Sequence, residues 1–196
     1  MTATYVRHLA DEGLGLSEVG GKGQSLARLA SAGVPVPNGF HITTAAYDDF
    51  VAQHDLQQAI DGQLSSANES DVEATAGAAS AIEQLFRDRD IPSAIAADVL
   101  QAYHQLGSPA VAVRSSATAE DLPEASFAGQ QETFLNIARD DQLLVAVRGC
   151  WASLWTDRAV AYRADLGIDD AEVRLAVVVQ RMVTAQVAGV LFTADP

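Results

Sequence analysis

The stretch Ala112-Val113-Arg114-Ser115-Ser116-Ala117-Thr118 follows a long run of helical pattern and begins a segment with strand-like pattern. It begins with apolar residues, as a short buried strand does, and continues with an arginine and three hydroxyl side chains. The planar guanidinium of Arg114 can hold two oxygens of one phosphate, and neighbouring hydroxyls can add donors. The pattern indicates an anion clamp at a strand end. The alternative is an ion pair between Arg114 and Glu120 or Asp121, with the Ser and Thr hydroxyls capping a turn, and the residues alone favour neither interpretation.

Outward from this stretch, the hydrophobic patterns predict an α/β (α+β) chain with more helix than strand. Strands are expected at residues 40–43, 110–114, 133–137, 175–179 and 187–193. Helices are expected at residues 24–32, from 44 onward, and at 70–89, 92–107 and 140–164. The continuous apolar run 175–179 is typical of a central strand buried on both faces. Residues 61–70 are small and polar, which predicts a loop.

Composition places the chain among globular proteins and limits what it binds. Hydrophobic residues make up 48% of the 196 residues, and the net charge is −14. A field of this sign repels nucleic acid and acidic membranes, so neither is an expected partner. It also repels ATP. A nucleotide site would therefore need local positive charge, and Lys22 is the only lysine in the chain.

Cysteine, histidine and N-terminal patterns suggest little further chemistry. The single cysteine, Cys150, lies in an apolar stretch and is expected to be a buried, unreactive thiol. None of the four histidines (His8, His41, His54 and His104) shows a metal-binding spacing, and none is assigned a role. Neither a signal peptide nor a membrane-spanning run is visible in the sequence, which favours a cytoplasmic location.

Three further segments are suited to a nucleotide site. Gly20-Gly21-Lys22-Gly23 allows the backbone to approach a phosphate, and the helix expected after it would aim its N-terminus at an anion. It is not a P-loop, because Leu16 stands where that motif needs its first glycine. Residues 126–133 could form a flap over a ligand, and residues 177–183 could end a strand beside an adenine ring. The alternatives are a glycine turn, a hairpin connector, and a core strand with Met182 as filler.

Five segments occur together in this order: residues 19–23, 34–40, 112–123, 125–136 and 189–196. Taken together, they resemble the N-terminal ATP-binding domain of the phosphoenolpyruvate synthase, pyruvate phosphate dikinase and rifampicin phosphotransferase family. The resemblance covers nearly the whole chain and is most specific over residues 114–136. Residues 150–154 and 192–196 lean toward the rifampicin phosphotransferase branch.

The resemblance implies an ATP-grasp-like architecture, in which two lobes hold ATP between them. Residues 1–183 would form the first lobe, and residues 184–196 would begin a second, truncated lobe. The resemblance implies a catalytic role for Arg114 and a nucleotide site formed by Lys22, Arg114, Gly129, Thr133, Gln180, Met182 and Val183. Lys22 and Arg114 would contact phosphates, Gly129 to Thr133 would belong to a closing loop, and the last three residues would line the adenine pocket.

The reaction implied is transfer of the ATP β-phosphate to a histidine on a separate domain, with the γ-phosphate released to water. The phosphohistidine would then phosphorylate pyruvate or, in the alternative branch, rifampicin. The Mg²⁺ ligands are expected outside this chain, so no metal-binding residue is assigned in it. The expected partners are ATP and the phosphohistidine and acceptor domains of the parent protein.

The sequence ends in a predicted strand, which leads to an expectation of truncation and of self-association through that exposed strand. On its own the chain is expected to bind nucleotide weakly or not at all and to catalyse nothing. Two hypotheses of another class remain open. One is a short natural protein that serves as a non-catalytic nucleotide sensor or partner-binding lobe, and the other is a scaffold lobe without a nucleotide.

Overall fold

The computed structural model describes residues 4–66, 72–118 and 132–189, and every structural statement below concerns these residues. They form five strands: Val6–His8 (β1), Gly39–Ile42 (β2), Val111–Ala117 (β3), Thr133–Ile137 (β4) and Leu175–Arg181 (β5). The helices are Leu16–Ser31 (α1), Thr44–Gln53 (α2), Leu56–Ser66 (α3), Val72–Asp88 (α4), Ser93–Gln105 (α5), Asp140–Ala152 (α6) and Asp157–Leu166 (α7). A 3-10 turn, Ser153–Trp155, joins α6 to α7. The expected helix-rich mixed class is confirmed.

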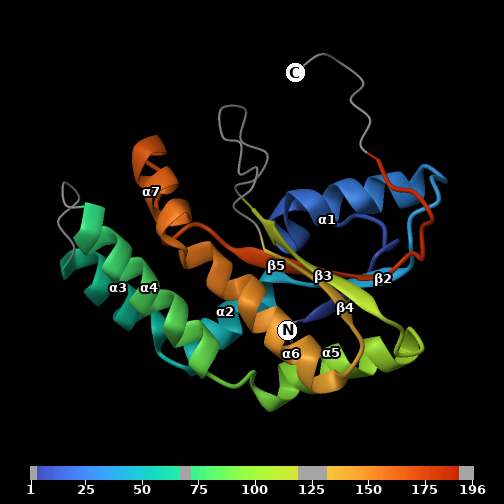
Figure 1. Cartoon of the computed structure of the whole chain (residues 1–196), viewed down its shortest axis with the longest axis horizontal. Helices are drawn as coiled ribbons and strands as arrows, with labels where there is room; N and C mark the ends of the chain where they lie inside the picture. Colours follow the sequence, from blue (N-terminus) through green and yellow to red (C-terminus); the bar gives the residue numbers. More distant parts are fainter. Residues whose placement is uncertain (1–3, 67–71, 119–131, 190–196) are drawn as a thin grey trace.

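The five strands form one sheet in the order β1-β2-β5-β3-β4, and every neighbouring pair is antiparallel. Figure 1 shows α1 on one side of this sheet and α5 and α6 on the other. The side that carries α1 is called the α1 face below, and the opposite side is called the core face. The sheet therefore separates a large apolar core from a thinner layer made by one helix.

Strand β5 holds the two layers together because both of its faces are apolar. Leu175, Val177 and Val179 belong to the main core cluster on the core face. Ala176 and Val178 alternate with them, point to the α1 face and are fully buried. This confirms the prediction of a central strand buried on both sides.

The core face is filled by an aromatic cluster of Tyr47, Phe50, Phe86, Trp151 and Trp155. The Phe50 and Trp151 ring centroids lie 4.9 Å apart, and the indole N–H of Trp155 donates to the Tyr47 hydroxyl at 3.2 Å. Close aromatic packing of this kind adds stabilisation beyond the area it buries. This core packs against one face of the sheet and stabilises it. The polar groups described below lie on the opposite face, the α1 face.

Cys150 lies in α6 on the core face and is fully buried, as the sequence predicted. Burial raises the pKa of its thiol well above the usual range, so the thiol stays protonated and unreactive at neutral pH.

Two helix predictions were wrong at their boundaries. Residues 61–66, expected in a loop, complete α3, because Leu56 and Ile60 give that helix a buried stripe at a spacing of four residues. The single helix expected over 140–164 is broken at the 3-10 turn Ser153–Trp155. There the Ser153 hydroxyl donates to the Cys150 carbonyl, and the Thr156 hydroxyl accepts from the Ala159 N–H as the N-cap of α7.

The strand expected at residues 187–193 is not formed where the structure describes it. Residues 187–189 have no regular secondary structure, and residues 190–193 lie outside the described part of the chain. The Val187 side chain is 88% exposed and so lacks the packing that a strand of the sheet would have. The self-association expected through this strand stays a prediction.

In the described residues no helix is long and apolar enough to cross a membrane.

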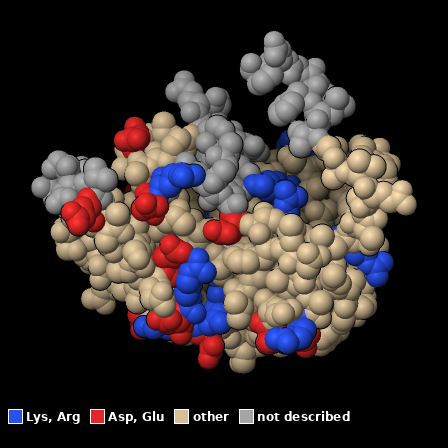
Figure 2. Space-filling view, viewed as in Figure 1, with Lys and Arg blue, Asp and Glu red and all other residues tan. Residues whose placement is uncertain are grey.

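Figure 2 shows Lys and Arg side chains scattered among Asp and Glu on the visible face rather than gathered in one basic patch.

Candidate functional site

One row of residues crosses the α1 face of the sheet from edge to edge. Arg7 pairs with His41, His41 with Val178, Val178 with Arg114, and Arg114 with Thr133. Residues paired across neighbouring strands point to the same face. The row, called the cross-sheet row below, therefore brings together Arg114 and Thr133, two of the residues expected in a nucleotide site, and adds His41 and Arg7.

The glycine-rich segment lies directly above this row but is not a turn before a helix, as was expected. It lies inside α1, which is kinked at Gly20 with φ 69° and ψ 177°. Only glycine adopts this backbone region readily. A Cβ on Gly20 would lie 2.2 Å from the Ser116 carbonyl oxygen, so the glycine is required for close contact with β3. The sequence suggested that these glycines let the backbone approach a phosphate closely. In the structure, Gly20 instead lets the backbone approach strand β3.

The hydroxyls of the expected anion clamp are occupied by backbone groups, which corrects that interpretation. The buried Ser116 hydroxyl donates to the Val19 carbonyl at 2.8 Å and accepts from the Gly23 N–H at 3.0 Å. The Ser115 hydroxyl donates to the Glu132 carbonyl at 3.3 Å, and the Thr118 hydroxyl accepts from the Arg174 N–H at 3.1 Å. These side chains position strands and α1, and of the predicted clamp only Arg114 remains for a ligand.

Replacing Ser116 with alanine should therefore reduce stability. It would leave the Gly23 N–H and the Val19 carbonyl without their partner in the interior, which is expected to cost about 2 kcal/mol. Ser115→Ala is the matched control, because its longer bond to Glu132 should be worth less than about 1 kcal/mol. Urea unfolding of both variants measures the difference. Equal losses of unfolding free energy in the two variants would contradict the role of Ser116 in holding the α1 kink against β3.

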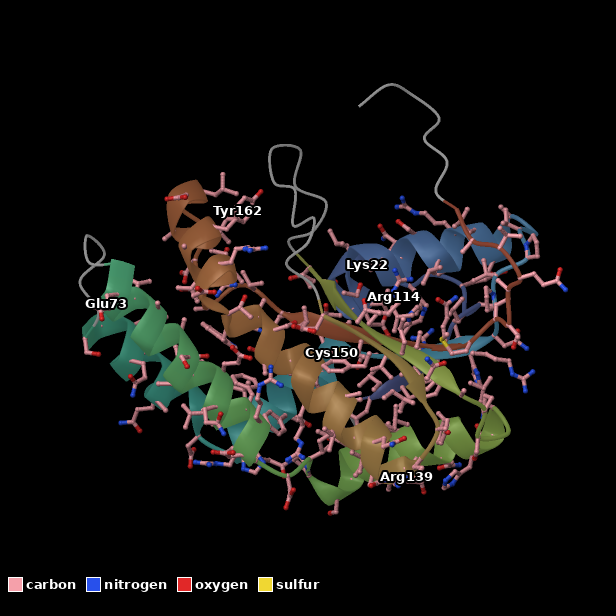
Figure 3. The ribbon with its side chains drawn as sticks, viewed as in Figure 1. Lys22, Glu73, Arg114, Arg139, Cys150 and Tyr162 are labelled. Carbon is pink, nitrogen blue, oxygen red and sulfur yellow. The ribbon has the colours of Figure 1, made fainter. Side chains whose placement is uncertain are left out.

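Two cations converge above the sheet next to the kink. Figure 3 shows Lys22, on α1, beside Arg114, on β3. Both side chains are partly buried, and Arg114 Nε is buried without a hydrogen-bond partner among the described residues. Glu120 and Asp121, the alternative partners of Arg114, lie outside the described residues.

The remaining predicted site residues follow β5 away from Arg114. Gln180 lies two residues beyond Val178 on the α1 face, and its amide donates to the Pro37 carbonyl at 3.3 Å. The Met182 N–H donates to the Ala110 carbonyl at 2.9 Å, which continues the pairing past the end of β5. Val183 is 61% exposed. Gly129 lies outside the described residues.

The distance along β5 fits an extended ligand. From Val178, the partner of Arg114, to Met182 there are four residues, which span roughly 13 Å of strand. The cationic end at Lys22 and Arg114 is suited to an anion. The far end offers the Met182 and Val183 side chains to an apolar ring. A ligand with phosphates at one end and a flat ring at the other matches this order.

Sequence reasoning missed His41, the most unusual group of the row. It is fully buried, and neither ring nitrogen has a hydrogen-bond partner among the described residues. Burial lowers its pKa to about 4, against smaller opposing effects of the Leu9 backbone and the Asp11 carboxylate. The available signal was its place in an otherwise buried strand, Phe40-His41-Ile42, where a titratable side chain is uncommon.

No group of three or more His, Cys, Asp or Glu in the described part of the chain could hold a metal ion.

Residues 16–196 match the sequence model of a family described as "Pyruvate phosphate dikinase, AMP/ATP-binding domain". The chain belongs to this family. The match includes both the glycine-rich segment of α1 and the Arg114 strand, so the two cationic elements of the site come from the shared domain.

Curated relatives with two different names support this family membership. The chain is 48% identical over 183 residues to a rifampicin phosphotransferase of Bacillus subtilis, covering 92% of this chain and 21% of that protein. It is 46% identical over 199 residues to a rifampicin phosphotransferase of a Streptomyces species, covering 100% and 23%. It is 41% identical over 216 residues to a phosphoenolpyruvate synthase of Pyrococcus furiosus, covering 91% and 26%. The chain thus spans about a fifth to a quarter of the relatives it matches.

Proposed function

We propose that this chain is a nucleotide-binding module of a dikinase-type phosphotransferase and that it binds the phosphates of ATP between α1 and the cross-sheet row. The observation that carries the proposal is the partly buried Arg114, whose Nε lacks a partner among the described residues, beside the only lysine of the chain. A buried guanidinium nitrogen without a partner is costly, and a phosphate oxygen would satisfy it. Family membership supports the choice of nucleotide over other anions.

In the proposed mode of binding, Lys22 and Arg114 neutralise the phosphates, and Thr133, the register partner of Arg114, adds a hydroxyl. Gly129 and its neighbours would close over the nucleotide. Gln180, Met182 and Val183 would line the adenine end. Mg²⁺ would arrive with the ATP phosphates, and its protein ligands would lie outside this chain.

The architecture proposed for the parent protein is ATP-grasp-like. Residues 1–183 would form the first lobe, and residues 184–196 would lead into the second. In the parent protein the β-phosphate of ATP would pass to a histidine on a separate domain, and the γ-phosphate would pass to water. The acceptor would be pyruvate or rifampicin, and relatives with both names support these two equally. This chain alone would bind nucleotide without completing the transfer.

A non-catalytic nucleotide sensor is the alternative of another class. It uses the same site and predicts the same binding. It differs in predicting that the longer protein transfers no phosphate from ATP, which an assay for radiolabelled phosphohistidine would decide.

Calorimetric titration with Mg-ATP tests the nucleotide site. Wild type should bind saturably, and Arg114→Ala should bind about tenfold to a hundredfold more weakly, because a hydrogen bond to a charged group is worth about 1.5–3 kcal/mol. Arg139→Ala is the matched control. It removes the same charge from an exposed arginine that is paired with Asp141, away from the proposed site in Figure 3. An absence of saturable heat, or equal losses in the two variants, would contradict the proposal.

A further inference from the structure

His41 lies where a purely structural residue would normally be apolar. It occupies the middle of β2 on the α1 face, between Arg7 and Val178 of the cross-sheet row. Its side chain has no exposed surface, and neither ring nitrogen makes a hydrogen bond of good geometry among the described residues, although the Leu9 backbone lies close enough to raise the pKa of the ring slightly against the effect of burial. An unpaired polar group in the interior costs stability, and leucine would fill a similar volume without that cost. The imidazole therefore needs an explanation other than packing.

The imidazole lies against the segment of α1 that carries Lys22. A Cβ on Gly23 would lie 3.2 Å from His41 Nδ1, so the bare Gly23 backbone packs on the ring. On the other side of β5, Ser116 binds the Gly23 N–H and contacts Gly20. The glycine-rich segment thus rests on two supports that flank the central strand: Ser116 on β3 and His41 on β2.

The charges around His41 explain why an uncharged ring suits this position. Arg7 and Asp11 act on it from β1 and the segment that follows, and Arg7 also binds Glu18 at the start of α1. Lys22 lies on the segment of α1 that rests on the ring, and Arg114 lies two strands away in the same row. Burial keeps the imidazole neutral at neutral pH, so it supports the segment without adding a third repelling charge beside two cations.

We propose that His41 is a positioning residue for Lys22, and that its imidazole beneath Gly23 holds the α1 segment so that the lysine side chain stays beside Arg114. The consequence for ATP affinity rests on the function proposed above. The placement of Lys22 does not rest on it, and it can be measured without nucleotide.

The single lysine makes a direct test available. After trace acetylation of the whole chain, cleavage at arginine places Lys22 in the peptide of residues 8–28 and the N-terminal amine in residues 1–7. Mass spectrometry then gives the labelling rate of Lys22 alone. His41→Leu should label several-fold faster than wild type, because the segment loses its support, and His41→Gln should fall between them. Phe40→Leu, the neighbouring substitution on the core face, is the matched control and should leave the rate unchanged.

The same variants separate this inference from the proposed function. A group displaced by about 1 Å can cost up to about a hundredfold in function, so we expect His41→Leu to weaken Mg-ATP binding about tenfold and Phe40→Leu to leave it unchanged. Labelling rates that are equal in His41→Leu and wild type, or that rise as much in Phe40→Leu, would overturn the role of His41. If wild type binds no Mg-ATP, and Mg-ATP does not slow the acetylation of Lys22, the proposed nucleotide site is wrong. The acetylation rates measured without nucleotide still test the role of His41.

Discussion

Replacing Gly20 with alanine is expected to destabilise the protein by about 4 kcal/mol, the sum of a backbone term and a steric term of about 2 kcal/mol each. The backbone at Gly20 has φ 69° and ψ 177°, which a residue with a side chain adopts only under strain. The added Cβ would also meet the Ser116 carbonyl oxygen at 2.2 Å, and this atom is fixed in the middle of the sheet. Relief requires α1 to lift from β3, which would carry Lys22 away from Arg114. Nucleotide binding should therefore fall together with stability.

Two other glycines separate the backbone term from the contact. Gly33 has φ 76° and nothing within 4 Å of a Cβ, so Gly33→Ala should cost only about 1 kcal/mol. Gly62 lies exposed within α3, and Gly62→Ala should stabilise by about 0.5–1 kcal/mol. Urea unfolding followed by circular dichroism measures all three variants. A Gly20→Ala loss no larger than that of Gly33→Ala would show that the contact with Ser116 does not constrain α1.

Stability should fall by about 3 kcal/mol between pH 6.5 and pH 4 because of His41 alone. Burial lowers the pKa of His41 from 6.5 to about 4 in the folded protein, so the unfolded chain binds more protons throughout this range. Proton binding then favours unfolding as the pH falls. The contribution of His41 is fully present above pH 6.5 and is lost progressively toward pH 4.

The difference between wild type and His41→Leu isolates this effect from the carboxylates that titrate nearby. The wild-type unfolding free energy should decline relative to that of the variant from pH 6.5 downward. His8→Gln, which removes an exposed histidine from the adjacent strand β1, should keep the wild-type slope. Parallel curves for wild type and His41→Leu over this range would mean that the imidazole takes up a proton in the folded state without cost.

Local pattern was enough to predict the elements with a strong hydrophobic period. The helix expected at residues 92–107 rests on Ile95, Val99 and Tyr103, which recur every four residues, and the three side chains are fully buried in α5. The apolar run of β5 predicted a strand buried on both faces. The same reasoning failed for residues 61–66, where small polar residues hide the short apolar stripe of α3. Composition favoured a loop there, but burial of that stripe in the core outweighed it.

For the proposed site, the sequence indicated the residue types at the proposed phosphate end but not the contacts between them. It selected Lys22 and Arg114 because positive charges can be read directly from the sequence and are few in this acidic chain. It left open whether the hydroxyls of Ser115 and Ser116 bind a ligand or cap a turn, because sequence does not show which backbone groups lie nearby. The bond from Gly23 to Ser116 joins positions 93 residues apart.

The sequence by itself determined the family, the helix-rich mixed class and the two cations, because these follow from motifs and short-range hydrophobic period. Only the tertiary structure decided the register that aligns His41, Val178 and Arg114, and the kink that sets Gly20 against Ser116. The physical reason is that strand side chains repeat every two residues, so pattern gives the alternation of faces and leaves the partner strand and its register open. These are fixed by long-range packing, since the chain must bury both faces of β5 at once.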